Sequence, residues 1–457
     1  MISRPMIRYM MSIVSLIGCA PPAAPVAPVE EAEINPIVPS DVSGEIAFVN
    51  ATVLTMMSEE IHHNFSVLVR NQRIAAIGET GSFDIPVTAQ VIECQGAFLM
   101  PGLADMHTHV YYREDLLPYV ANGVTTVLNM GSPSTILQFR DLVSAGELLG
   151  PTILGSGFVD GIPPNGWVVT TAEEARATVR NLKQAKWDFI KVYNSIKTDV
   201  FLALMDEARK EGMPVIGHGV REPGMERILN EGQVMVAHAE EYIYTFFHNS
   251  LNEAFISEAV ALTVSTRAYV TPTLSAYEII KLQWGNQQGL ETLLAQPEVL
   301  YVSPTWITRW RNSKRYTLNS GSIAAPFEFQ RKLVKALSDG GVPLLLGTDS
   351  PFVPGVVPGH SIYRDLRNLV SAGLTPYQAL KAGTSTAGDF IKSTVSDSEE
   401  FGTIEVEKRA DLLLLKRNPL LNVDNASLRS GVMVRGRWLS QEKLDLMLDS
   451  LANHFSN

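Results

Sequence analysis

The chain has 457 residues, of which 46% are hydrophobic and 8% aromatic, enough to bury a large core and to form more than one domain. Its formal net charge is −11, from 37 basic and 48 acidic residues, and the basic residues form no cluster. This balance argues against a nucleic-acid-binding protein, because binding to phosphates requires concentrated Lys and Arg.

The first 18 residues have the pattern of a signal peptide. Arg4 and Arg8 precede the apolar stretch MMSIVSLIG, which is far shorter than the ~20 residues that a membrane-spanning helix needs. The sequence LIGC, ending at Cys19, resembles the bacterial lipobox, whose cysteine is lipidated after cleavage of the signal. We therefore expect an exported protein that is lipid-anchored to a bacterial membrane. The expected membrane is the outer membrane, with the protein facing the periplasm. The alternative is an ordinary cleaved signal with a chance cysteine.

A proline-rich tether is expected over residues 19–44, since six prolines and few bulky apolar residues occupy 20–39. The second of the two cysteines, Cys94, lies in the strand-like AQVIECQG. If Cys19 carries lipid, no intramolecular disulfide can form. Cys94 is then best interpreted as a small buried residue.

Both ends of the remaining chain are rich in predicted strands. Residues 45–100 contain EIAFVNATVLTM, NFSVLVRNQRIAAIG and AQVIECQGAFLMP, with turns at Asn71-Gln72 and Gly81, and residues 398–445 contain TIEVEKRADLLLLKRN and GVMVRGRWLS. We expect one β-sandwich domain built from both pieces. Residues 446–457 are left as a C-terminal tail.

Between these pieces, residues 101–397 alternate apolar strand-like runs with helical stretches. Thr171 and Glu174 form a capping-box pattern at one helix start, and Gly212 before Pro214 ends another helix. The runs are continuously hydrophobic, as in parallel strands buried on both faces. They read LADMHTH, TTVLNM, PTILGSG, DFIKVYN, PVIGHG, VMVAHA, YVTPTL and PLLLGTD. Eight βα units predict an α/β fold, a (β/α)8 TIM barrel, whose chemistry lies at the C-terminal ends of the strands.

Polar residues occur at the ends of these apolar runs, where a titratable group is costly unless it is paired or bound to metal. The first run ends in two histidines at positions i and i+2, which point to the same face of a strand. Taken singly, each residue has a structural explanation, such as a core histidine, a buried ion pair or a helix N-cap. Together the set favours a metal site formed by His107, His109, Lys191, His218, His238 and Asp349.

This set, in this order along the strands, resembles the amidohydrolase superfamily. The segment AFLMPGLADMHTH looks like the family's entry into the first strand, and ADLLLLKRNPL near the C-terminus is a further likeness. One departure is Glu407, at a position often held by glycine.

The resemblance implies two divalent ions, most simply Zn²⁺, with manganese and cobalt left open. One ion would be held by His107, His109 and Asp349, and the other by His218 and His238. Lys191 would be carbamylated by CO₂ and would bridge the ions together with a hydroxide. Asp349 would be the catalytic proton acceptor.

Four further segments resemble the branch of prolidase-like dipeptidases and ochratoxin-type amidases. They are IKVYN, IGHGVREPGMERILNEG, VAHAEEYIY and GLTPYQALKAGTSTAG. This resemblance implies cleavage of an amide in a dipeptide or N-acyl amino acid with a free carboxylate. The alternatives are an esterase, lactonase or phosphotriesterase, and a non-enzymatic binding protein, which would lack at least one ligand.

Substrate contacts are expected from the segments after the sixth and eighth strands, namely Tyr242, Tyr244, His360 and Arg364, although packing or surface exposure would explain each of them. Trp284, Trp306 and Trp310, between the seventh and eighth strands, would form either an aromatic wall over the site or helix core. The expected partners are a small-molecule substrate and, through the lipid alone, a membrane. Homo-oligomerisation is left open.

Replacing Cys19 by Ser should release the protein from membrane fractions, because nothing after LIGC is apolar enough to span a bilayer. Fractionation followed by immunoblotting measures this. A variant that still sediments with membranes would show that the anchor is something other than the lipid on Cys19.

Overall fold

A computed structural model describes residues 44–163, 166–396 and 398–456. The expected signal peptide, the lipidated Cys19 and nearly all of the tether lie outside the described residues. Within the described part, no helix combines the length and the apolarity needed to cross a bilayer.

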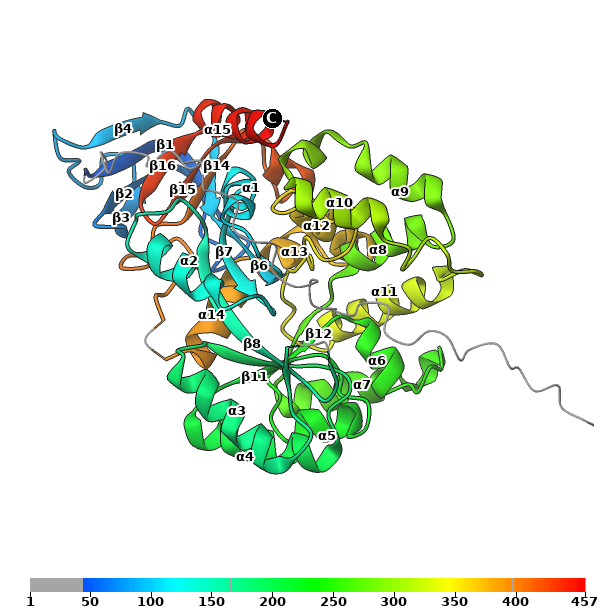
Figure 1. Cartoon of the computed structure of the whole chain (residues 1–457). Helices are drawn as coiled ribbons and strands as arrows, with labels where there is room; N and C mark the ends of the chain where they lie inside the picture. The colour runs from blue at the N-terminus through cyan, green and yellow to red at the C-terminus, as the bar shows by residue number, and fades with distance from the viewer. Residues whose placement is uncertain (1–43, 164–165, 397, 457) are drawn as a thin grey trace, which may run out of the picture.

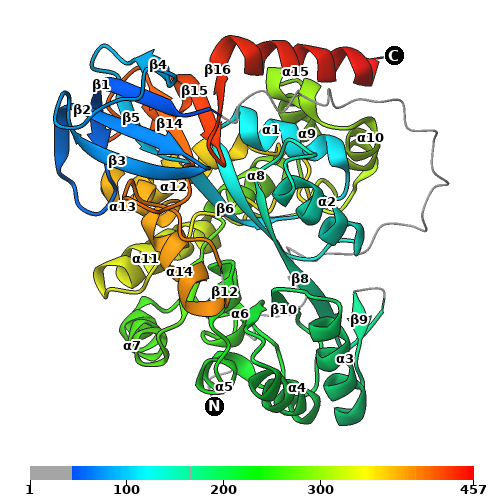
Figure 2. The same ribbon diagram turned by 90° about the vertical axis from the view of Figure 1, so that its left-hand side faces the viewer.

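One domain is a mixed sheet formed from both ends of the chain, which lie side by side in Figures 1 and 2. The N-terminal part supplies β1 (Ile46–Leu54), β2 (Ile61–Arg70), β3 (Arg73–Glu79), β4 (Gln90–Glu93) and β5 (Phe98–Pro101). The C-terminal part supplies β14 (Leu412–Leu415), β15 (Arg429–Val434) and β16 (Arg437–Ser440). The strand order is β16-β15-β14-β5-β1-β2-β3, with β4 on β1, so the two parts join where β14 pairs antiparallel with β5. This is the expected small β domain.

The second domain is the expected parallel barrel. Its strands follow one another in the order β13-β12-β11-β10-β8-β7-β6, and the short β9 pairs with β8. The strands are β6 (Leu103–Thr108), β7 (Val124–Asn129), β8 (Thr152–Asp160), β9 (Trp167–Val168), β10 (Phe189–Val192), β11 (Val215–Gly217), β12 (Met235–Ala237) and β13 (Tyr269–Thr271).

The eighth predicted strand, PLLLGTD, does not form a regular strand. Residues 344–350 close the barrel through isolated bridges, Leu344 to Val270 and Ser350 to Thr108. The backbone N–H of Met106 donates to the Leu346 carbonyl at 2.8 Å, and that of Asp349 donates to the His107 carbonyl at 2.7 Å. Asp349 has a φ of 64°, which interrupts the extended backbone that a ladder needs.

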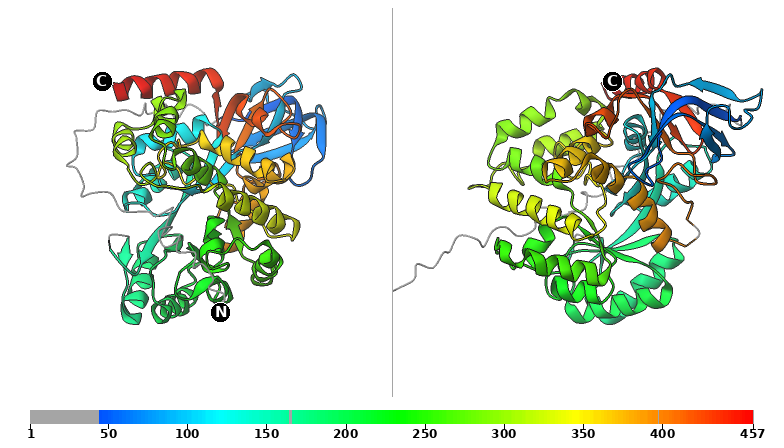
Figure 3. Two further views of the ribbon diagram at one scale, coloured as in Figure 1. Left: turned by 90° about the vertical axis from the view of Figure 1, so that its right-hand side faces the viewer. Right: turned by 180° about the vertical axis from the view of Figure 1, so that it is seen from behind.

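Helices surround the barrel strands (Figure 3). The helices of the first half are α1 (Leu116–Ala121), α2 (Thr135–Ser144), α3 (Ala172–Gln184), α4 (Thr198–Glu211), α5 (Gly224–Asn230), α6 (Glu240–Thr245) and α7 (Ile256–Thr266). Those of the second half are α8 (Leu274–Gln283), α9 (Gln287–Leu294), α10 (Pro304–Asn312), α11 (Ala324–Asp339), α12 (Ser361–Ser371), α13 (Pro376–Ala382), α14 (Ser385–Thr394) and α15 (Gln441–Ser456). The described residues also form four 3₁₀ turns, η1 (Arg113–Asp115), η2 (Glu253–Phe255), η3 (Pro297–Tyr301) and η4 (Val423–Ser427).

Several local predictions are confirmed. Thr171 and Glu174 form a reciprocal capping box at the start of α3, and Gly212 ends α4 with a φ of 62°. Glu407 adopts a φ of 72°, the left-handed conformation that explains why glycine suits this position. Cys94 is buried, and burial raises the pKa of its thiol to about 12.

Residues 446–457, expected to be a tail, instead belong mostly to α15, which runs to Ser456. The helix buries Leu444, Met447, Leu448 and Leu451, which are spaced three and four residues apart and so share one face. It packs against α1, β15 and η3 and therefore ties the β domain to the barrel.

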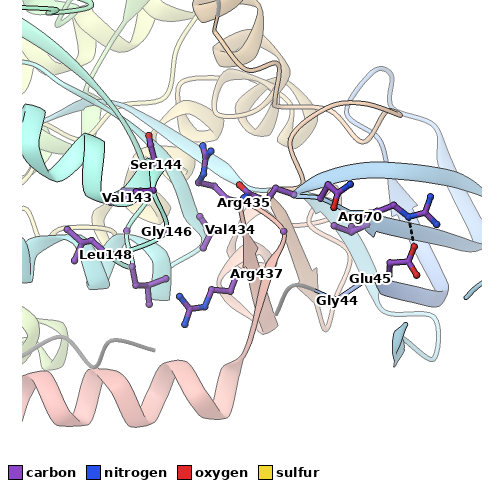
Figure 4. A pocket seen from close by; sticks show the side chains of 17 residues that line it. Gly44, Glu45, Arg70, Val143, Ser144, Gly146, Leu148, Val434, Arg435 and Arg437 are labelled. Atoms are coloured by element: carbon purple, nitrogen blue, oxygen red, sulfur yellow. Dashed lines mark hydrogen bonds and ion pairs between the residues drawn. The ribbon is translucent and has the colours of Figure 1, made fainter. Parts of the chain in front are cut away.

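A cavity of about 380 Å³ lies where the β domain meets the turn between α2 and β8 (Figure 4). Arg70, Arg435 and Arg437 line it together with Glu45. Because β8 begins at Thr152, just after the turn that lines it, this cavity lies at the N-terminal end of the barrel strands. That is the end opposite to the one expected to carry the chemistry.

Candidate metal centre

The six predicted ligands come together at the C-terminal ends of the barrel strands. His107 lies at the end of β6 and His109 directly follows it; Lys191 lies in β10. His218 and His238 directly follow β11 and β12, and Asp349 lies in the closing segment. All six side chains are 0% exposed, so their polar atoms face one another rather than solvent.

The imidazoles and the carboxylate form one continuous cluster. Asp349 Oδ1 lies 2.9 Å from His109 Nε2 and 3.2 Å from His107 Nε2, and ligand atoms of the three residues all fall within 4.8 Å of one another. The His107 and His238 rings are 4.5 Å apart between centroids, and the His238 and His218 rings are 4.6 Å apart.

The outer nitrogens of three histidines are held by hydrogen bonds. Nδ1 of His109 donates to the Gly131 carbonyl at 3.0 Å, and Nδ1 of His218 donates to Glu241 Oε1 at 2.8 Å. Nδ1 of His238 lies 2.6 Å from Thr273 Oγ1, whose own proton goes to the Pro272 carbonyl. These contacts assign the proton to Nδ1 and leave the Nε2 lone pair directed at the centre, as in histidines that ligate metals.

The inner atoms of the cluster fit a metal ion. Nε2 of His107, His218 and His238 and both oxygens of Asp349 are buried without a hydrogen-bond partner among the described residues. Neutral imidazole nitrogens and carboxylate oxygens suit divalent transition metals such as zinc. A buried donor set left unsatisfied is costly, and a bound cation would remove that cost.

The protonation states suit this interpretation. Burial lowers the pKa of His107 to about 3, and burial together with neighbouring Lys191 and His107 lowers the pKa of His218 and His238 well below the usual range. Burial disfavours an ionised Asp349, but the adjacent His107 and His109 outweigh it and hold the pKa of this carboxyl well below its usual range. Neutral histidines and an ionised aspartate are the ligating forms.

The backbone at the centre is strained. His238, Asp349 and Thr273 have φ values of 71°, 64° and 49° without being glycine. Such residues cost of order 1–3 kcal/mol each and cluster at functional sites. Two of them are predicted ligands, and the third orients a ligand.

Lys191 points into the cluster from β10. Its Nζ donates to the Met130 carbonyl at 2.9 Å and lies 5.3 Å from the centre of the Phe158 ring. It lies within electrostatic range of His107, His218 and His238.

Sequence reasoning missed several residues that support the centre. Asp105 accepts hydrogen bonds from Thr348 Oγ1 at 2.6 Å and from the backbone of Thr348 and His107 at 3.0 and 3.2 Å. Glu241 holds His218, as described above. The adjacent Glu240 is 1% exposed, and burial and the nearby Glu241 raise the pKa of its carboxyl well above the usual range. The sequence HAEE, with two carboxylates just after a strand-end histidine, was the available signal.

Three of the four predicted substrate contacts pair with residues outside the cluster of predicted ligands. Tyr242 is 0% exposed and shares a hydrogen bond of 2.8 Å with Thr263 on α7. His360 pairs with Glu298 at 3.3 Å, and Arg364 pairs with Glu278 at 3.2 Å. These contacts do not connect the three residues to the predicted ligands, and their substrate role stays a prediction from the sequence. Their partners lie on neighbouring elements, with Thr263 on α7, Glu298 on η3 and Glu278 on α8.

Tyr244 lies closer to the centre, with its ring 4.6 Å from the guanidinium of Arg221, which in turn contacts Glu241. Of the four residues, Tyr244 is the one whose described contacts lead to the predicted ligands, through Arg221 and Glu241 to His218.

The tryptophan-containing stretch supplies both a wall and core packing. Phe352 packs on His109 at 5.1 Å between ring centres, and Trp306 packs on Phe352 at 6.4 Å. Trp310 is fully buried and its indole nitrogen donates to the Pro351 carbonyl at 2.9 Å. Trp284 donates instead to the Ser320 carbonyl at 3.1 Å. The aromatic cover beside the centre thus comes from Trp306 and Phe352.

A parallel barrel with buried imidazoles, a lysine and a carboxylate at its C-terminal rim defines the class of barrel hydrolases that use metal ions. Residues 98–439 match the amidohydrolase family, and the chain belongs to it. It is therefore a hydrolase acting on C–N bonds.

Known structures share this architecture. A protein assigned as a prolidase from Bifidobacterium longum is 25% identical, with a TM-score of 0.67, covering 90% of this chain and 99% of that one. Bottromycin amidohydrolase is 23% identical, with a TM-score of 0.72 and 90% of each chain covered. An adenine deaminase from Deinococcus radiodurans is 29% identical over 26% of this chain, and the match spans only 21% of that enzyme's length.

Replacing Glu241 by Gln should weaken zinc binding by roughly 10- to 100-fold, because the amide still reaches His218 but loses the charge that fixes the imidazole. Competition with a chromogenic chelator measures the affinity. Glu226→Gln on the exposed side of α5 is the matched control and should bind zinc as the wild type does. Equal affinities in all three proteins would remove Glu241 from the support of the centre.

Proposed function

We propose that the protein hydrolyses the amide bond of a dipeptide or N-acyl amino acid that has a free carboxylate, with two divalent ions, most simply Zn²⁺. The observation that carries the proposal is the set of buried Nε2 atoms and Asp349 oxygens that converge without a hydrogen-bond partner among the described residues. His107, His109 and Asp349 would hold one ion, and His218 and His238 the other. A carbamate on Lys191 would bridge them.

The chemistry that such ions supply when bound is activation of water and polarisation of the scissile carbonyl. Asp349 is the proton acceptor, because it is ionised and its Oδ2 is not used by His107 or His109, whose short contacts are to Oδ1. The same oxygen delivers that proton to the leaving nitrogen.

The substrate class rests on the surroundings of the centre. Phe352 and Trp306 offer an apolar surface next to His109, which suits a hydrophobic side chain beside the scissile bond. The guanidinium of Arg309 lies 4.7 Å from the Phe352 ring and 4.9 Å from the Trp306 ring, and so supplies a positive charge for a substrate carboxylate. Similarity to the protein assigned as a prolidase supports the same class.

The location of the enzyme is a separate part of the proposal. The lipobox-like LIGC supports export and lipid anchoring through Cys19, with the catalytic domains held away from the membrane by the proline-rich tether.

Purified, zinc-loaded protein should hydrolyse Xaa-Pro or Xaa-hydrophobic dipeptides or N-acyl amino acids faster than aryl esters, lactones or phosphotriesters, measured by amine release and chromatography. Asp349→Asn should reduce this turnover by at least ~1,000-fold while retaining substantial metal, since the amide can ligate but cannot accept the proton. Faster turnover of esters or phosphotriesters would favour the alternative hydrolase classes. Near-normal rates in the variant would exclude Asp349 as the proton acceptor.

Lys191→Ala should bind fewer than two metal ions per chain and be nearly inactive, because the bridging group is lost. Metal analysis and amine release measure the two effects, and small carboxylic acids should partly restore activity by occupying the vacated position. ¹³C NMR after incubation with labelled bicarbonate tests the modification directly. Full metal content in the variant, or no carbamate signal in the metal-loaded wild type, would contradict the bridging role.

A further inference from the structure

Glu240 is a buried carboxylate that the metal centre does not use. It is the first residue of α6, two positions after the ligand His238, and is 1% exposed. Neither of its oxygens has a hydrogen-bond partner among the described residues. Buried oxygens without a partner are unfavourable, so this position calls for a hydrogen-bond donor that arrives from outside the chain.

The neighbouring Glu241 differs from Glu240, because both of its carboxylate oxygens accept hydrogen bonds. It accepts from His218 Nδ1 at 2.8 Å and from both terminal nitrogens of Arg221. Arg221 also donates to the Gly219 carbonyl at 2.8 Å. The guanidinium beside these two carboxylates is therefore hydrogen-bonded to Glu241 and not to Glu240.

The position of Glu240 relates it to the reacting groups. Glu240 lies within electrostatic range of Glu241, Arg221, Arg315 and Asp349, and Tyr244 lies within range of Glu240. Tyr244 follows it by one helical turn on the same face of α6. A carboxylate with an aromatic ring one turn away is a combination that binds ammonium and guanidinium groups.

This inference rests on the proposed amide hydrolysis and narrows its substrate. We propose that Glu240 binds a positively charged group of the substrate, an ammonium or a guanidinium, close to the metal centre. The enzyme would then prefer dipeptides, which carry a free ammonium or a basic side chain, over N-acyl amino acids, whose acylated nitrogen is uncharged.

Kinetics of Glu240→Gln on matched substrates test the proposal. With zinc-loaded protein, kcat/KM for Ala-Leu should fall roughly 10- to 100-fold through KM, while N-acetyl-Ala-Leu changes less than about 3-fold. If a side chain supplies the charge, the selective loss appears instead for Ala-Lys relative to Ala-norleucine. Glu258→Gln, exposed on α7, is the control and should leave every value unchanged.

Equal losses on charged and uncharged substrates would overturn the proposal, because Glu240 would then act through the metal ligands or the fold. Loss of zinc in the variant would overturn it as well, by making Glu240 part of the metal site.

A thermal-shift measurement keeps the test independent of turnover. L-leucinamide, which carries an ammonium, should raise the melting temperature of the zinc-loaded wild type but not of Glu240→Gln, and N-acetyl-L-leucinamide should affect neither. Without ligand, the variant should melt no lower than the wild type, since the amide has nearly the same shape as the carboxyl group and its oxygens were unpaired. If the wild type cleaves no amide but shows this selective shift, the proposed function fails and cation binding by Glu240 stands. Equal shifts in both proteins, or none with either probe, would refute the cation site.

Discussion

The contact between β6 and residues 344–350, the first and last segments of the barrel, fixes the relative positions of the predicted ligands at its C-terminal rim. Residues 344–350 are held to β6 and β13 by a few backbone hydrogen bonds rather than by a regular ladder. One buried carboxylate, Asp105, accepts from Thr348 and from the backbone of His107 and so locks the two segments together from the side. His107 belongs to β6 and Asp349 belongs to residues 344–350. A metal ion held by both residues would therefore be a second link between the two segments.

The same buried environment explains why the centre holds neutral imidazoles and a charged carboxylate at once. Burial suppresses protonation of His107, His218 and His238, and the hydrogen bonds from Nδ1 of His218 and His238 keep their Nε2 atoms available. The strained φ values of His238, Thr273 and Asp349 are tolerated because surrounding packing holds them. The fold therefore holds these strained residues in fixed positions, and this preorganises the site that we propose to bind metal.

Much of this arrangement could be predicted from the sequence because parallel barrel strands share one direction, so polar residues at their C-terminal ends must meet. That rule brought the six predicted ligands to one rim, but it fails where the partner depends on rotation about a helix. Tyr242 and Tyr244 are two positions apart on α6 and therefore point roughly 200° apart, and only Tyr244 faces Arg221. The irregular eighth strand could not be foreseen, since the φ of Asp349 is imposed by its neighbours. The second-sphere Thr273 depends on a turn that no pattern marks.

The β domain has a consequence for how the chain is made. Strand β5 lies in the middle of its sheet, between β1 and β14, yet β14 is encoded after the entire barrel. A nascent chain that ends within the barrel therefore presents β5 as an open edge, which is a template for pairing with other chains. Translation of β14, β15 and β16 converts this edge into the centre of the sheet, and it also joins the segments that precede and follow the barrel.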